Sequence, residues 1–117
     1  MLKSLILGIF VKIEESEMSG FFVLVSFELN NKGLLSDWKI LSKEIDDDIS
    51  SVKGFISRDS GIDEQGYVYC LLKWQSRTYQ EAFMRQLESR DDWPKTMEDF
   101  GRIANIETMT FKNIALF

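Results

Sequence analysis

The chain has 117 residues, of which 44% are hydrophobic and 28% charged, as expected of one folded domain with its own core. Its net charge is −5 and it has no Lys/Arg run, which excludes the electrostatic footprint of a nucleic-acid-binding protein. It contains no histidine and one cysteine, Cys70, so histidine-dependent catalysis, histidine-ligated metal or haem sites and an internal disulfide are excluded. Nothing in the cysteine usage supports an oxidising compartment, and we expect a cytoplasmic protein.

Residues 1–19 are expected to form an extension ahead of the main domain, which spans residues 20–117. Within the extension, Leu5–Val11 (LILGIFV) is a short apolar run. A secretory signal is the poorer interpretation, because Lys12 and Glu14 follow closely and no small-residue cleavage site appears. We expect an added edge strand or an arm that lies on a partner subunit. No segment approaches the ~20 apolar residues that cross a bilayer, so no membrane partner is expected.

The first part of the main domain reads as a strand followed by a helix. Phe21–Leu29 (FFVLVSFEL) is rich in Phe and Val, and its two alternating faces are both largely apolar. Asn30, Asn31 and Gly33 supply a turn. The helix is expected over residues 34–52, with a stripe at spacings of three and four: Leu34, Trp38, Leu41, Ile45, Ile49 and Val52.

Three successive aspartates, Asp46–Asp48, lie within this helix. Successive helix positions point in different directions around the axis, so the three carboxylates cannot converge on one metal ion. We interpret them as part of a solvated face, and no metal site is expected.

The second part continues with two strands, two helices and a closing strand. Gly54 ends the first helix, residues 55–58 open a strand, residues 59–66 form a hairpin loop, and Tyr67–Trp74 is the next strand. Ser76 or Thr78 is expected to cap the following helix, Thr78 forming a capping box with Glu81. Pro94 fits the first turn of a new short helix, and residues 107–117 form the last strand.

This order predicts an α+β, ferredoxin-like βαββαβ fold, in which helices cover one face of a four-stranded antiparallel sheet. The opposite face would expose an apolar patch of five side chains: Phe22, Leu24, Tyr67, Tyr69 and Leu71. Such a patch is too large to be exposed to water on a soluble monomer, so we expect a homodimer in which the two sheets pack against each other.

Over residues 20–117 the sequence resembles the antibiotic biosynthesis monooxygenase-like (ABM) family of dimeric α/β barrels. The resemblance rests on Gly54-Phe55 at the start of the second strand and on Trp74-Gln75-Ser76 leading into a helix with Ala82-Phe83. It implies a cavity between sheet and helices, with Trp74 at its wall and Val68, Cys70 and Leu72 pointing the same way.

The resemblance also implies an activity. Oxygenases of this family act without metal or flavin on electron-rich aromatic or quinol-type molecules, so no cofactor is expected. In several members an asparagine in the first strand assists the reaction. The matching position in this chain is Val25 or Ser26, so that polar side chain is missing or altered. The haem-degrading branch needs a histidine where this chain offers residues such as Met84, so haem degradation is not expected.

Each candidate site residue also has a structural interpretation. Trp74 is a pocket wall or a large core residue, and Trp38, Phe83 and Met84 face a ligand or simply pack. The Tyr79 hydroxyl orients a phenolic ligand or lies at the rim, and Cys70 reads as a buried thiol. Arg85 and Arg77 are the cations expected near the pocket mouth, where one of them would stabilise a phenolate or enolate. No general base is evident.

Three functional hypotheses follow. The first is a cofactor-independent monooxygenase, and the second is a non-enzymatic, small-ligand-binding or stress-related dimer that keeps the cavity without the reaction. In the third, the chain's own side chains fill the cavity and the protein is a structural dimer.

Overall fold

A computed structural model describes residues 20–117, and the expected N-terminal extension, with its Leu5–Val11 strand, lies outside the described residues. The described chain forms one four-stranded antiparallel sheet with strand order β2-β3-β1-β4. The strands are β1 (Phe21–Leu29), β2 (Phe55–Ile62), β3 (Tyr67–Trp74) and β4 (Ala104–Ala115). The helices are the 3-10 turn η1 (Lys32–Leu34), α2 (Leu35–Ile49), α3 (Arg77–Glu88) and α4 (Trp93–Ile103).

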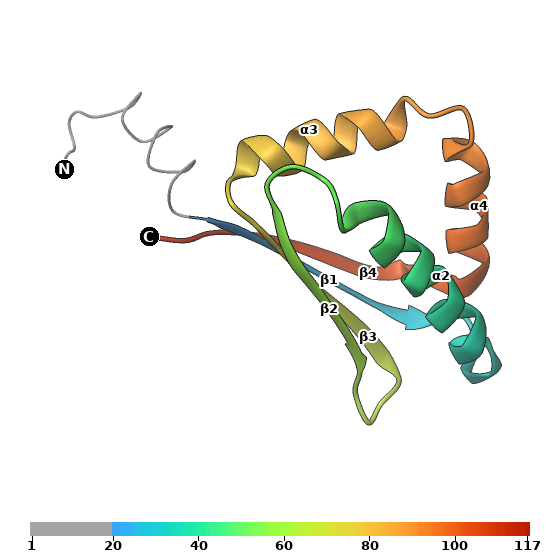
Figure 1. The fold of residues 1–117 in the computed structure, drawn as a ribbon. Coiled ribbons are helices and arrows are strands. Elements are labelled where there is room, and N and C mark those ends of the chain that lie inside the picture. The colour runs from blue at the N-terminus through green and yellow to red at the C-terminus, as the bar shows by residue number, and fades with distance from the viewer. Residues whose placement is uncertain (1–19) are drawn as a thin grey trace.

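Figure 1 shows α2, α3 and α4 together on one face of the sheet. This arrangement confirms the predicted α+β, ferredoxin-like fold. Within residues 20–117, no helix combines the length and the apolar character that crossing a bilayer requires.

Two predicted strand boundaries are wrong. β2 continues to Ile62 instead of ending at Arg58, and the hairpin loop shrinks to residues 63–66. The turn is tight because one carboxylate oxygen of Asp63 accepts hydrogen bonds from the backbone N–H groups of Gln65 and Tyr67, both at 2.9 Å. β4 begins at Ala104, three positions before the predicted residue 107, directly after α4.

The predicted capping box at the start of α3 is also wrong. Ser76 occupies the N-cap position with extended backbone, but its side chain makes no capping hydrogen bond. Glu81 instead accepts a hydrogen bond from Arg77 Nε at 3.1 Å, one helical turn away. The helix begins where it was expected, but its first turn carries the Arg77–Glu81 pair and no capping box.

The core consists of two clusters between the sheet and the helices. Phe27, Trp38, Val68, Cys70, Ile103 and Ala104 form the first cluster. Phe21, Val23, Ile49 and Trp74 form the second. The predicted alternation of β1 and the predicted stripe of α2 supply five of these ten residues, and Val25 and Leu72 pack against both clusters. The two clusters therefore meet above the middle of β1 and β3.

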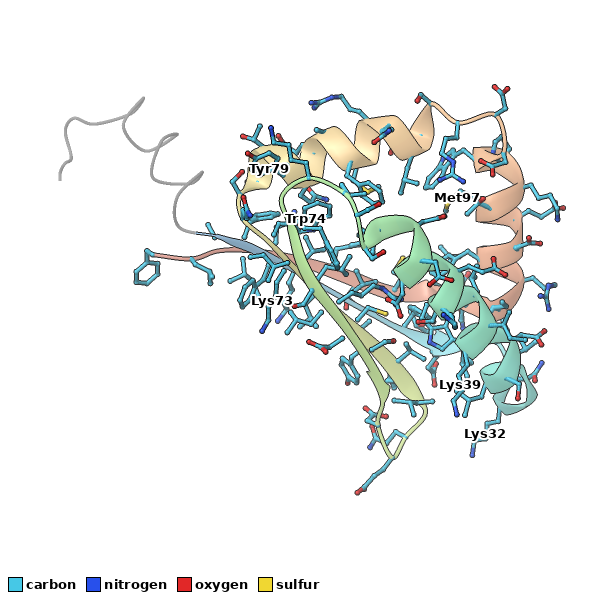
Figure 2. All side chains as sticks on the ribbon, viewed as in Figure 1. Lys32, Lys39, Lys73, Trp74, Tyr79 and Met97 are labelled. Carbon is cyan, nitrogen blue, oxygen red and sulfur yellow. The ribbon has the colours of Figure 1, made fainter. Side chains whose placement is uncertain are left out.

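The opposite face of the sheet carries the predicted apolar side chains. Leu24 pairs with Leu71, Phe22 with Lys73, and Ser26 with Tyr69 across β1 and β3, while Ile114 extends the face onto β4 opposite Phe22. No α-helix of the described chain lies on this side (Figure 1). Figure 2 shows Lys73 pointing away from the helices, on the side of the sheet opposite to them.

Candidate functional site

A cavity of about 230 Å³ lies between the sheet and the three α-helices, where the two core clusters meet. Its floor comes from the sheet: Val25, Phe27, Arg58, Cys70 and Leu72. Its walls come from α2 (Trp38, Ile45, Asp48, Ile49), α3 (Phe83, Met84, Leu87), the α3–α4 connection (Arg90, Asp92) and α4 (Trp93, Thr96, Phe100). The lining is overwhelmingly apolar, as is usual for a site that binds a small organic molecule.

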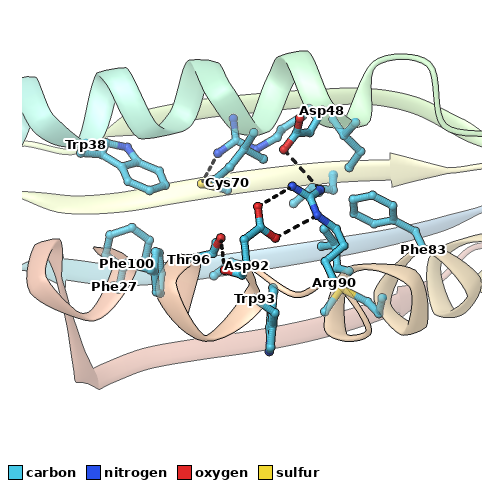
Figure 3. A pocket seen from close by; sticks show the side chains of 17 residues that line it. Phe27, Trp38, Asp48, Cys70, Phe83, Arg90, Asp92, Trp93, Thr96 and Phe100 are labelled. Atoms are coloured by element: carbon cyan, nitrogen blue, oxygen red, sulfur yellow. Dashed lines mark hydrogen bonds and ion pairs between the residues drawn. The ribbon is translucent and has the colours of Figure 1, made fainter. Parts of the chain in front are cut away.

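One end of the cavity is built from three aromatic rings in edge-to-face contact. Phe27 meets Trp38 at a centroid distance of 5.1 Å and Phe100 at 5.3 Å, with interplanar angles of 86° and 81°. Trp38 and Phe100 complete the group at 6.2 Å (Figure 3). Such a cluster is rigid, because each ring fixes the orientation of its neighbours.

Arg58 supplies a buried positive charge at the cavity floor. Its side chain is only 3% exposed. Nη1 donates to Asp46 Oδ1 at 2.8 Å and to Ser42 Oγ at 2.8 Å, and Nη2 donates to Cys70 Sγ at 3.6 Å. The guanidinium also lies 5.9 Å from the centre of the Trp38 ring, within the range of a cation–π contact.

A second charged group closes the cavity between α2 and the α3–α4 connection. Arg90 pairs with Asp92 at 3.2 Å and with Asp48 at 3.6 Å, as the dashed lines in Figure 3 show. The hydrogen bond and the charge of Asp92, with a smaller contribution from Asp48, raise the pKa of the Arg90 guanidinium. Asp48, Phe83, Leu87 and Arg90 also line an outer hollow between the end of α2 and α3. The Asp48–Arg90 pair therefore lies between the outer hollow and the inner cavity.

The three successive aspartates of α2 separate as predicted. Asp46 pairs with Arg58 at 2.8 Å, Asp47 with Lys43 at 3.3 Å, and Asp48 with Arg90 at 3.6 Å. Each carboxylate has a different cation because successive side chains leave the helix in different directions. Within residues 20–117, no group of histidine, cysteine or acidic residues is arranged to hold a metal ion.

The structure brings most of the predicted site residues to the cavity wall: Val25, Trp38, Cys70, Leu72, Phe83 and Met84. Their roles toward a ligand stay predictions. Trp74 is placed differently: it is 1% exposed and packs on Phe55 and Phe83 with ring centroids 5.5 Å apart in each case. Phe83 lines the cavity and Trp74 does not. Of the two interpretations of Trp74, the structure shows the core residue.

Tyr79, Arg85 and Arg77 also lie away from the cavity lining. Tyr79 covers Gly54 and borders the outer hollow. Arg85 is exposed on α3, and Arg77 pairs with Glu81 at 3.1 Å. Neither Arg85 nor Arg77 therefore supplies a cation to the cavity; the cations that line it are Arg58 at its floor and Arg90 at its mouth.

Sequence reasoning missed Arg58 because its direction depends on an irregularity in the strand. Phe55 packs in the core, and strict alternation from Phe55 would turn Arg58 away from the helices. The pairing of β2 with β3 shifts register between Phe55 and Ser57, and this shift places Arg58 opposite Leu72, on the face that the helices cover. Arg90 lies in the connection between two helices, where no periodicity fixes the direction of a side chain.

No family model matches this sequence, and no curated protein matches it. Solved structures do resemble it. A conserved protein from Methanosarcina mazei Go1 superposes with a TM-score of 0.70 at 10% identity, covering 87% of this chain and 97% of that chain. SnoaB, a cofactor-independent oxygenase from Streptomyces nogalater, gives a TM-score of 0.63 at 6% identity over 82% of this chain and 91% of that chain.

A candidate antibiotic biosynthesis monooxygenase from Chloroflexus aurantiacus J-10-fl gives a TM-score of 0.62 at 12% identity, covering 85% of this chain and 94% of that chain. At such low identities the likeness concerns the fold. The resemblance drawn from the sequence is confirmed at that level: this chain has the fold of antibiotic biosynthesis monooxygenase-like proteins.

Proposed function

We propose that the protein is a cofactor-independent monooxygenase that oxidises an aromatic or quinol-type small molecule in the cavity between sheet and helices. The observation that carries this proposal is the cavity itself, which is apolar and aromatic-walled and has charged groups at only a few points. Its fold is shared with SnoaB, which is a cofactor-independent oxygenase.

The proposed chemistry needs an electron-rich substrate. A monooxygenase places one atom of molecular oxygen in the product, and the other leaves as water. Without a metal or flavin, the substrate supplies the electrons, and it does so most readily after losing a proton to become a phenolate or enolate. A dry cavity favours the reaction by excluding water from reactive intermediates.

The origin of the base limits the range of substrates. The two carboxylates at the cavity, Asp48 and Asp92, are both paired with Arg90, and the chain has no histidine. No unpaired carboxylate lines the cavity within the described residues. The substrate must therefore be acidic enough to ionise without a strong protein base, as hydroquinones and anthrones are.

The same observation favours a second function, in which the protein binds an aromatic molecule and does not transform it. A ligand-binding or stress-related protein needs the apolar cavity but no base. The two functions differ in whether oxygen is consumed when the cavity is occupied.

Oxygen uptake with a panel of hydroquinones and anthrones separates these functions. Met84 lines the cavity, whereas the next residue, Arg85, is exposed on the same helix. Met84→Trp should fill the cavity and abolish uptake, and Arg85→Trp should leave it unchanged. Uptake that stays at background, with probe binding that Met84→Trp blocks, would identify a binding protein.

We also propose that the protein is a homodimer joined through the uncovered face of the sheet. Leu24 and Leu71 pair at the centre of this face, and Phe22 and Ile114 extend it. Leu24→Glu places a charge there and should give monomers in sedimentation. Ile40→Glu, on the exposed side of α2, is the matched control, because Ile40 is 62% exposed. A wild-type protein that sediments as a single chain at micromolar concentration would overturn the dimer.

A further inference from the structure

Arg58 differs from the other cation at the cavity in being almost completely buried. Its side chain is 3% exposed, whereas that of Arg90 is 43% exposed and pairs with two aspartates at the mouth. A buried guanidinium loses its hydration, so its N–H groups need acceptors inside the protein or in a bound molecule.

The acceptors of Arg58 lie mainly on the side away from the cavity. Nη1 donates to the carbonyl and the hydroxyl of Ser42 and to Asp46. Ser42 and Asp46 do not line the cavity but border a separate groove between α2 and β2. The guanidinium thus lies between the cavity and the groove, with Nη1 directed toward α2 and the groove.

The edge toward the cavity is poorly satisfied. Nη2 donates to Cys70 Sγ at 3.6 Å, and sulfur is a weak acceptor. Nε–H and the second Nη2–H have no acceptor among residues 20–117. Arg58 and Cys70 both line the cavity, so this edge lies next to the space that a ligand would occupy.

We propose that the cavity-side edge of Arg58 binds an oxyanion of the ligand, so that the cavity selects aromatic acids and ionised phenols over neutral aromatic molecules. A guanidinium edge matches the two oxygens of a carboxylate, and a phenolate oxygen accepts from the same donors. The aromatic group of Phe27, Trp38 and Phe100 lies beside Arg58, whose guanidinium is 5.9 Å from the centre of the Trp38 ring, and it offers a surface on which the ligand's rings pack. This inference rests on the proposed function only in taking the cavity as a ligand site, and it defines the class of ligand.

The charge of Arg58 is not fully neutralised by its partner. Asp46 has a side chain that is 51% exposed, so water screens its negative charge, while Arg58 faces an apolar space where screening is weak. Removing the Asp46 charge should therefore strengthen the binding of an anion. A purely structural role for Arg58 predicts no such effect.

The test compares naphthalene with naphthoate, which share the ring system but differ in charge, by calorimetry or ligand fluorescence. Wild-type protein should bind naphthoate at least about 10-fold more tightly than naphthalene, because the charge-assisted bonds outweigh the loss of hydration. Arg58→Gln should abolish this preference while naphthalene binding changes little. Arg58→Lys keeps the charge without the planar fork and should give an intermediate preference. Naphthol, measured below and above its own pKa, tests the phenolate.

Asp46→Asn keeps the test informative if Arg58→Gln does not fold, because Asp46 is half-exposed and asparagine retains an oxygen that accepts the hydrogen bond from Nη1. It should raise the affinity for naphthoate and leave naphthalene unchanged. Asp47→Asn, which removes a carboxylate paired only with Lys43, is the matched control. Equal binding of the two probes in the wild type, or a preference that Asp46→Asn leaves unaltered, overturns the inference.

The failure of this inference is distinguishable from failure of the proposed function. A preference for naphthoate without oxygen uptake on any quinol overturns the oxygenase and leaves the anion site. Oxygen uptake on a quinol without a preference for naphthoate supports the oxygenase and overturns the anion site. If neither probe binds, the cavity is not a ligand site and both proposals fall.

Discussion

Phe83 and Trp74 are in contact, with ring centroids 5.5 Å apart and an interplanar angle of 39°, yet only Phe83 reaches the cavity. Phe83 comes from α3, which stands over the cavity, whereas Trp74 ends β3 and is enclosed by the second core cluster. Trp74, which the sequence places at the centre of the site, therefore packs behind Phe83 and does not line the cavity.

Trp74→Phe should therefore affect stability slightly and ligand binding not at all. The indole Nε1–H is buried without an acceptor in the described chain. Losing it removes an unsatisfied donor, which offsets part of the lost packing, and we expect a cost below about 1.5 kcal/mol. Trp74→Ala should cost about 3–5 kcal/mol. Urea unfolding and naphthalene titration measure both effects, and a Trp74→Phe protein that folds but no longer binds would contradict this placement.

Gly54→Ala should destabilise the protein strongly. Gly54 has a φ of 85°, a region that side chains disfavour, and an added methyl group would overlap the ring of Tyr79. We expect a loss of roughly 2–4 kcal/mol in urea unfolding. In the double variant Gly54→Ala/Tyr79→Ala the overlap disappears but the strained φ remains, so the two changes should cost less than their sum. Strict additivity would show that Tyr79 does not press on Gly54.

The Asp48–Arg90 pair should control how fast a ligand reaches the cavity. It lies between the outer hollow and the cavity, at 3.6 Å, and both side chains are partly exposed. Asp48→Asn should raise the association and dissociation rates of naphthalene together, roughly two- to fivefold, since an exposed ion pair is weak. The dissociation constant should change little. Stopped-flow fluorescence measures the rates, and Asp47→Asn, one residue away, should match the wild type.

The β2–β3 hairpin should make stability depend on pH at both ends of the range. The backbone N–H of Tyr67 chiefly lowers the pKa of Asp63, with help from the Tyr69 hydroxyl and the N–H groups of Gln65 and Gly66. A folded pKa below the unfolded one gives a contribution that is present above the ordinary value of 3.8 and is lost as the pH falls through the folded value. Asp63→Asn should flatten this acid limb of the urea midpoint. An unchanged acid limb would mean that the turn does not depend on the carboxylate.

Tyr69 acts in the opposite direction. Its hydrogen bond to Asp63 raises the pKa of the phenol, so its contribution is present below the ordinary value of 10.0 and is lost as the pH rises through the higher folded value. Tyr69→Phe should remove this alkaline loss while leaving most of the acid limb. The two variants together separate the partners of one hydrogen bond.

Cys70 should report whether the cavity is occupied. It is the only cysteine in the chain, it is 4% exposed, and it lines the cavity. A thiol reagent should label it slowly in the folded protein, and bound naphthoate should slow the labelling further. Labelling in urea gives the unhindered rate as a reference. Equal rates with and without ligand would place the ligand elsewhere.

The sequence by itself determined the order of strands and helices, because periodicity is a local property. The alternation of Phe21–Leu29 and the stripe that includes Trp38 and Ile49 both follow from which residues must leave water. Strand alternation also predicts the uncovered apolar face of the sheet, and helical periodicity predicts that the three aspartates separate. The two periodicities together place most of the cavity wall.

Only the tertiary structure decided which charges meet the cavity and which aromatic rings enclose it. Residues 58–61 (Arg-Asp-Ser-Gly) have little tendency to form a strand, and they extend β2 because β3 offers hydrogen-bond partners as far as Val68. That pairing turns Arg58 toward the helices. Likewise, Trp74 lies behind Phe83 because α3 crosses the end of β3, a relation between elements that no local pattern contains.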